Sequence, residues 1–176
     1  STIANNDKVG VIFFSDKIEK YIPAQKGKTH VLHIIRELLS FEPSSKGTDI
    51  AQALQYFANA QKRHCTAFLI SDFIGAGDVD KPLLIASNRH EVNAIQIYDR
   101  HEAELPNIGL VKFHDAESDN DLWIDTSLAS VRKEYAQAWK ENQDSLEQLF
   151  TRTGVNHISV RTDEDYVKAL MHLFRC

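Results

Sequence analysis

The sequence predicts an α/β fold of three layers, in which helices cover both faces of a mainly parallel sheet. Two observations support this prediction. Continuous apolar runs of strand length recur along the chain, which is typical of strands buried on both faces. Segments whose apolar residues repeat with the helical period separate these runs. An alternation of strands and helices in this order favours parallel strands joined by helical crossovers.

The first third of the chain is predicted to contain two strands and two helices. The apolar run 9–14 predicts a buried strand. The weaker alternation at 17–22 ends at Pro23 and predicts an edge strand that turns back on the first. Apolar residues at helical spacing within 29–43 predict one amphipathic helix, and those within 49–62 predict a second.

The rest of the chain continues the alternation and adds one antiparallel hairpin. The predicted elements are strands at 66–71, 92–98 and 155–160, helices at 79–88, 128–153 and after 162, and a hairpin of strands at 110–114 and 121–125. We expect the run 9–14 to join the first three of these strands in one parallel sheet.

The composition is that of a single globular domain. The 176 residues are 43% hydrophobic and 26% charged, which suffices for a core and argues against disorder. The net charge of -5 and the scattered basic residues argue against a nucleic-acid binder. No run approaches the roughly 20 apolar residues that span a bilayer. Two cysteines without metal or disulfide spacing favour a reducing compartment, so we expect a cytoplasmic protein without membrane contact in this segment.

Two short stretches, "SKGTDI" and "LISDFIGAGD", contain the candidate binding residues. Asp72 follows the apolar run 66–71, and Thr48 opens the helix predicted upstream of it. Ligands of open parallel sheets bind at the carboxyl ends of the strands. Hydroxyl and carboxylate oxygens suit Mg²⁺, so Thr48 and Asp72 are candidates for half of a metal site. The alternatives are that Thr48 is a helix N-cap and that Asp72 caps a loop.

The same edge admits an enzyme hypothesis. Asp78, Asp80 and Asp99 could join Asp72 in a metal-dependent phosphoesterase with two metal ions, because several carboxylates follow strands or lie close to their ends. A protein-binding site and a phosphoesterase site therefore both stay open at this point.

Six segments taken together, in their order and spacing, resemble the bacterial family known as domain of unknown function 58, from about residue 6 to the end. They are "NDKVGVIFFSDKIEKYIPAQKGKTHVLHII", "KGTDIAQAL", "FLISDF", "IQIYDRHEAELP", "GLVKFHDAESDNDLWIDTS" and "TDEDYVKALMHLF". The resemblance implies a von Willebrand factor A-like fold. In such folds a metal-ion-dependent adhesion site uses a DxSxS motif after the first strand, a later threonine and an aspartate after the fourth strand. Thr48 and Asp72 match the last two by position.

The resemblance also implies that residues 1–176 are one von Willebrand A-like domain without its first strand and its DxSxS loop. Mg²⁺ or another divalent cation is then expected in the full-length protein and not in this segment. The strands at 9–14 and 66–71 would lose a common neighbour. We expect these two strands to pair directly, or a second copy of the chain to supply a strand.

The function that the resemblance implies is that of a non-enzymatic protein-binding module. Its cation would accept an acidic side chain of a client protein, and the module would serve as adaptor or co-chaperone of a MoxR-type AAA+ ATPase. The alternatives are the phosphoesterase and a scaffold whose metal site is vacant.

Overall fold

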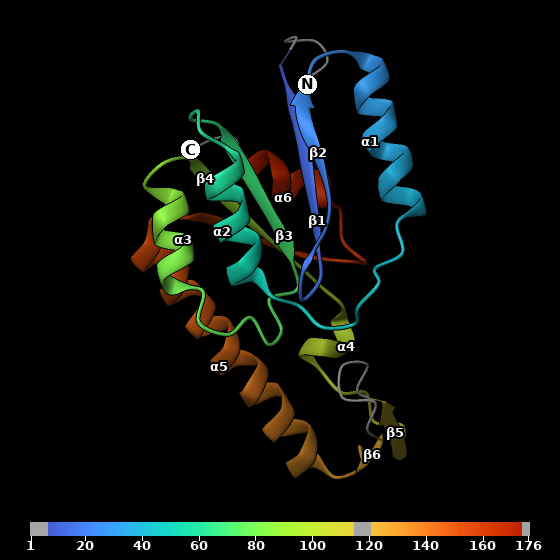
Figure 1. Cartoon of the computed structure of the whole chain (residues 1–176). Coiled ribbons are helices and arrows are strands. Elements are labelled where there is room, and N and C mark those ends of the chain that lie inside the picture. The colour runs from blue at the N-terminus through green and yellow to red at the C-terminus, as the bar shows by residue number, and fades with distance from the viewer. Residues whose placement is uncertain (1–6, 115–120, 174–176) are drawn as a thin grey trace. The chain divides into compact units, whose positions relative to one another are not determined.

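The computed structural model describes residues 7–114 and 121–173. Within the chain, contacts define two compact units. The first comprises Ser1–Lys62 and Gly75–Pro82, and the second comprises Arg63–Ile74 and Leu83–Cys176. The two units are described separately below, and Figure 1 labels their elements.

The first unit is built on an antiparallel hairpin of β1 (Val9–Phe14) and β2 (Ile18–Gln25). The pairing confirms the predicted hairpin. The prediction that the second strand ends at Pro23 is wrong, because β2 continues to Gln25. Pro23 lies where the register shifts between the pairs Val11↔Ile22 and Val9↔Gln25, and a proline without an N–H is tolerated at such a bulge.

Two helices contact this hairpin, α1 (Lys28–Ser40) and α2 (Ile50–Ala60), where the apolar periods predict helices. Helix α1 buries none of its residues. Helix α2 buries a stripe of small and aliphatic side chains, which are Ile50, Ala53, Leu54 and Ala58. Aromatic pairs join the layers: Phe13 of β1 stacks on Phe41 with ring centroids 4.7 Å apart, and Tyr21 meets Tyr56 edge-on at 5.7 Å. The core of this unit therefore lies between β1, β2 and α2.

The second unit contains a parallel sheet of three strands in the order β3-β4-β7, which are Thr66–Ser71, Glu91–Tyr98 and Asn156–Arg161. The central strand β4 is the most buried: Val92, Ala94 and Ile95 are at most 8% exposed. All three strands agree with the predicted strands to within one residue at each end, and the parallel α/β fold is confirmed.

The run 9–14 forms β1 of the first unit, so its place in the parallel sheet of the second unit stays a prediction. Within the residues that the structure describes, β1 pairs with β2 and β3 pairs with β4, in two separate sheets. Because β1 lies in the first unit and β3 in the second, direct pairing of 9–14 with 66–71 stays a prediction. A strand supplied by a second copy stays a prediction.

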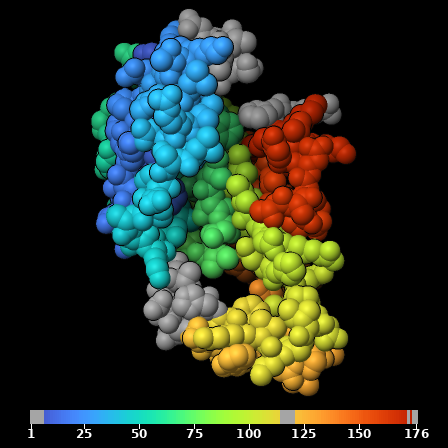
Figure 2. Space-filling model, turned by 90° about the vertical axis from the view of Figure 1, so that its right-hand side faces the viewer, coloured from blue at the N-terminus to red at the C-terminus, as the bar shows by residue number. Residues whose placement is uncertain are grey.

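The remaining described elements are four helices and a hairpin. All of them belong to the second unit apart from the start of α3, which lies in the first. Their bounds are α3 Asp80–Ser87, α4 Arg100–Ala103, α5 Ala129–Thr153, α6 Tyr166–Leu173, β5 Leu110–His114 and β6 Asp121–Asp125. The hairpin is antiparallel, as predicted. Gly154 ends α5 with φ 67°, the left-handed conformation in which glycine is favoured. In Figure 2, α6 (red) and the segment around α4 (yellow-green) are seen at the surface of this unit.

The core of the second unit is centred on Phe150 of α5, which is 2% exposed. Its ring meets Phe73 edge-on at 5.3 Å and lies 4.9 Å from the ring of His157 on β7. Helices α5 and α6 both contact β7. Phe150 thus packs against the turn that follows β3 and against the sheet at the same time.

Candidate site at the carboxyl ends of the parallel strands

Asp72 lies in the turn that follows β3, and its side chain is exposed. The carboxylate Oδ1 accepts a hydrogen bond from Ile74 N at 3.0 Å, and Ser71 Oγ accepts one from Phe73 N at 3.1 Å. Phe73 has φ 59°, an uncommon conformation for a bulky residue, and its ring is 2% exposed. The burial of Phe73 thus holds the turn, and the turn orients Asp72. Asp72 therefore caps this turn through the bond to Ile74, and a role in binding a cation stays a prediction.

Gln96 of β4 supports this turn from the sheet. It lies opposite Ser71 of β3 on one side and Ser159 of β7 on the other. Its side chain, 3% exposed, donates from Nε2 to Asp72 O at 3.3 Å and accepts from Ser159 Oγ at 2.8 Å. A buried amide with both ends hydrogen-bonded fixes its neighbours. Gln96 therefore links β4 to Asp72 after β3 and to Ser159 of β7 through its side-chain hydrogen bonds.

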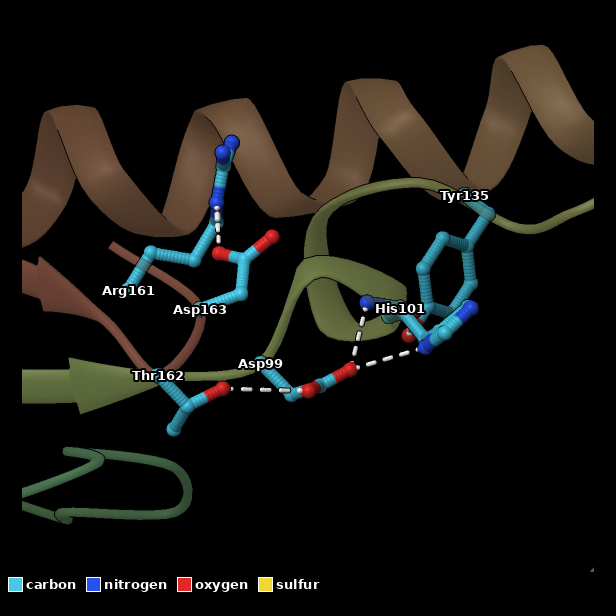
Figure 3. Close-up of polar contacts among 6 residues, drawn as sticks. All are labelled: Asp99, His101, Tyr135, Arg161, Thr162 and Asp163. Carbon is cyan, nitrogen blue, oxygen red and sulfur yellow. Dashed lines mark hydrogen bonds and ion pairs between the residues drawn. The ribbon is translucent and has the colours of Figure 1, made fainter.

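Asp99 follows β4 and is the N-cap of α4. Its Oδ1 accepts from His101 N at 2.8 Å and lies 2.9 Å from His101 Nδ1, while Oδ2 accepts from Thr162 Oγ1 at 3.2 Å (Figure 3). These hydrogen bonds, chiefly those from His101, lower the pKa of Asp99. Both carboxylate oxygens thus accept hydrogen bonds, and the bond from Thr162 links the end of β4 to the end of β7.

Glu102 of α4, the helix that follows Asp99, is half-buried. Its Oε2 is buried and accepts no hydrogen bond from the described part of the chain. Burial raises the pKa of Glu102, and the negative charges of Asp72 and Asp99 raise it further. Burial also raises the pKa of Tyr135, whose hydroxyl donates to His101 O at 3.2 Å. This edge of the sheet is therefore acidic.

A hollow of about 500 Å³ lies beside Asp99. Its lining combines acidic, basic and apolar side chains, which are Asp99, Arg100, His101, Glu104, Leu105, Pro106 and Asp163. Asp163 at its rim is paired with Arg161, with Nε and Oδ1 2.5 Å apart (Figure 3). A lining with both positively and negatively charged side chains suits a protein surface better than a uniformly anionic ligand.

Thr48 belongs to the first unit, where it is exposed in the loop before α2. The N-cap of α2 is Asp49, whose Oδ1 accepts from Gln52 N at 2.8 Å. The alternative that Thr48 caps this helix is therefore wrong. Because Thr48 and Asp72 belong to different units, their proximity stays a prediction, as does the clustering of Asp78 and Asp80 with Asp72.

The donor chemistry of Thr48 and Asp72 suits a hard divalent cation, but their number is insufficient. Mg²⁺ demands near-octahedral coordination and is weakly bound by two protein oxygens and water. Over residues 7–114 and 121–173, no group of three or more His, Cys, Asp or Glu side chains could hold a metal ion. The two residues could thus contribute to a magnesium site but do not complete one.

We expect the 176-residue chain to bind Mg²⁺ more weakly than with a dissociation constant of about 10 μM, because two protein oxygens replace too few waters of the hydrated ion. Isothermal titration calorimetry with MgCl₂ measures this directly. Micromolar affinity that is retained in the double variant Thr48→Ala/Asp72→Ala would instead show a metal site elsewhere. Micromolar affinity lost in that variant would show that the two residues suffice.

Two mycobacterial proteins are similar in sequence to this chain. The uncharacterized protein Rv1480 of Mycobacterium tuberculosis is 28% identical over 165 residues, which cover 92% of this chain and 51% of that protein. The uncharacterized protein MAV169 of Mycobacterium avium is 28% identical over 158 residues, 88% of this chain and 92% of that protein. The chain thus spans about half the length of Rv1480.

Two solved structures share the fold. The conserved hypothetical protein BatB from Bacteroides thetaiotaomicron superimposes with a TM-score of 0.59 at 16% identity, over 96% of this chain and 78% of that one. An aerotolerance-related membrane protein from Bacteroides fragilis gives a TM-score of 0.58 at 17% identity, over 97% and 81%. Both neighbours therefore share the α/β fold of this chain. In this chain, no helix within the described ranges has the length and apolarity to cross a bilayer.

The family described as "Protein of unknown function DUF58" matches residues 1–145, more than four-fifths of the sequence, and includes both Thr48 and Asp72. The chain belongs to this family.

Proposed function

We propose that this chain is a non-enzymatic protein-binding module that recognises an acidic side chain of a partner, and that it acts as adaptor or co-chaperone of a MoxR-type AAA+ ATPase. The observation that carries the proposal is the exposed Asp72 carboxylate, fixed at the end of β3 by a buried Phe73 and by Gln96. A rigid exposed group loses little conformational freedom on binding. The choice of ATPase follows from the family resemblance.

A divalent cation, where bound, would supply the positive charge that an acidic partner residue needs, with Thr48 and Asp72 among its oxygen ligands. Within this chain, Asp72 Oδ1 is used by the turn, while Oδ2 accepts no hydrogen bond from the described residues. The carboxylate can therefore face a ligand without opening its own turn. The hollow beside Asp99 offers Arg100 and His101 to further acidic groups of the partner.

The phosphoesterase is the second candidate, because Glu102, Asp72 and Asp99 lie close enough for the two aspartates to raise the pKa of Glu102. The geometry of Asp99 disfavours a metal ion held by both of its oxygens, because Oδ1 accepts from His101 N and also lies 2.9 Å from His101 Nδ1. Within the described residues, Oδ2 accepts only from Thr162 Oγ1, so Asp99 could offer a metal one oxygen without losing a hydrogen bond.

We expect no hydrolysis of bis(p-nitrophenyl) phosphate by the full-length protein with Mg²⁺ above the rate seen with the Asp72→Ala variant, because Asp99 is committed to α4 and β7. The measurement is release of p-nitrophenolate. Turnover that Asp72→Ala and Asp99→Asn each abolish, with the fold intact, would favour the phosphoesterase and contradict the proposal.

A further inference from the structure

The loop that contains Thr48 is attached to the β1–β2 hairpin at several points, all within the first unit. Asp49 N donates to Ser15 O at 2.8 Å, just after β1. Gly47 lies near Asp16: a Cβ added to Gly47 would be in ordinary van der Waals contact with Asp16 Cβ, at 3.4 Å. Thr48 is therefore flanked on both sides by residues that contact the turn between β1 and β2.

Glu19 of β2 provides the third attachment. Its Oε1 accepts from Ser44 N at 3.0 Å and from Ser15 Oγ at 2.7 Å, and its Oε2 accepts from Ser44 Oγ at 2.7 Å. Ser15 itself is 5% exposed. One carboxylate thus joins the start of the Thr48 loop to the end of β1. Hydrogen bonds to an ionised acceptor are stronger than those between neutral groups.

The charge state of Glu19 agrees with this arrangement. The hydrogen bonds from Ser44, and next those from Ser15, lower the pKa of Glu19 below its ordinary value. The carboxylate is therefore ionised at neutral pH and retains its full capacity as an acceptor.

We infer that Glu19 is a positioning residue, which holds the segment 44–49 so that Thr48 is presented for partner binding. The inference rests on the proposed function, in which Thr48 is one of the binding residues. Glu19 itself would not contact the partner or a cation, since its oxygens are used by Ser15 and Ser44.

Amide hydrogen exchange measured by NMR on the full chain tests the hydrogen bonds between Glu19 and Ser44 without any ligand. In Glu19→Ala, we expect the Ser44 amide to exchange at least about tenfold faster, because its charged acceptor is lost. Glu19→Gln keeps one acceptor oxygen and should fall between wild type and Glu19→Ala. Glu42→Ala removes an exposed carboxylate of the same unit and should change nothing. Wild-type exchange at Ser44 in Glu19→Ala would overturn the inference.

Affinity for the proposed ATPase tests whether Glu19 acts through Thr48. We expect Glu19→Ala to weaken binding about three- to tenfold in the wild-type background and not at all in the Thr48→Ala background. Equal losses in both backgrounds would overturn the positioning role. If Thr48→Ala leaves the affinity unchanged, Thr48 has no role in binding, and the proposed function of Glu19 as its positioning residue fails too. If the exchange rate of the Ser44 amide is unchanged in Glu19→Ala, only the structural role of Glu19 fails.

Discussion

Replacing Phe150 with alanine is expected to lower the free energy of unfolding of the second unit by about 3–5 kcal/mol, the usual cost of removing a fully buried aromatic ring from a core. Phe150 is 2% exposed and contacts both Phe73, at 5.3 Å between ring centroids, and His157, at 4.9 Å. The substitution removes the main ring against which Phe73 packs. Because Phe73 holds an unfavourable positive φ by packing, the Asp72 turn should loosen as well.

Urea unfolding followed by tryptophan fluorescence and far-UV circular dichroism measures this loss. Phe150→Leu should cost much less than the alanine variant, because it retains most of the buried volume. Trp123→Ala is the control for removing an aromatic ring from a position that is 61% exposed, and is expected to cost less than about 0.5 kcal/mol. A loss below about 1 kcal/mol in Phe150→Ala would contradict the central place of this residue in the core.

Replacing Asp72 with asparagine is expected to weaken binding of the ATPase at least about tenfold, because the side chain loses its negative charge while keeping its shape. The asparagine Oδ1 can still accept from Ile74 N, so the turn after β3 should persist. Asp72→Ala loses both the charge and the turn contact, and should bind at least as weakly.

The two Asp72 variants separate charge from local structure. Asp144→Asn is the matched control, since it removes an exposed carboxylate from α5 in the same unit. Biolayer interferometry with immobilised ATPase gives the affinities, and circular dichroism checks the fold. Wild-type affinity in Asp72→Asn with reduced affinity in Asp72→Ala would assign the effect to the turn and would contradict a role for the carboxylate charge.

The order and type of the elements other than α4 could be predicted because each has a local apolar period. The helix α4, with the sequence RHEA, has no such period and was missed. The pairing of β1 with β2 could be predicted too, but whether β1 also joins the parallel sheet could not. A continuous apolar run such as 9–14 indicates burial on both faces, and it has the same appearance in a parallel sheet and in a covered hairpin. Strand pairing depends on residues far apart in the sequence, and in the described chain β1 pairs with β2 alone. The extent of β2 was missed for a local reason, the bulge that accommodates Pro23.

For the candidate site, the sequence predicted the position of Asp72 at the end of a parallel strand, since an apolar run followed by a carboxylate is a local pattern. Gln96 was missed, although a glutamine within the apolar run 92–98 is a visible signal of a buried polar contact. Glu102 could not be found in this way. Its half-buried carboxyl depends on the packing of α4 against α5, which no local period shows.

The most direct test of a protein-binding function is calorimetric titration of the full-length protein with a MoxR-type AAA+ ATPase from the same organism, with Mg²⁺ and then with EDTA. We predict saturable binding with a dissociation constant of about 10 μM or tighter, weakened by EDTA and by Asp72→Asn but not by Asp144→Asn. Absence of binding under both conditions, together with Mg²⁺-dependent phosphodiester hydrolysis that requires Asp72, would contradict it.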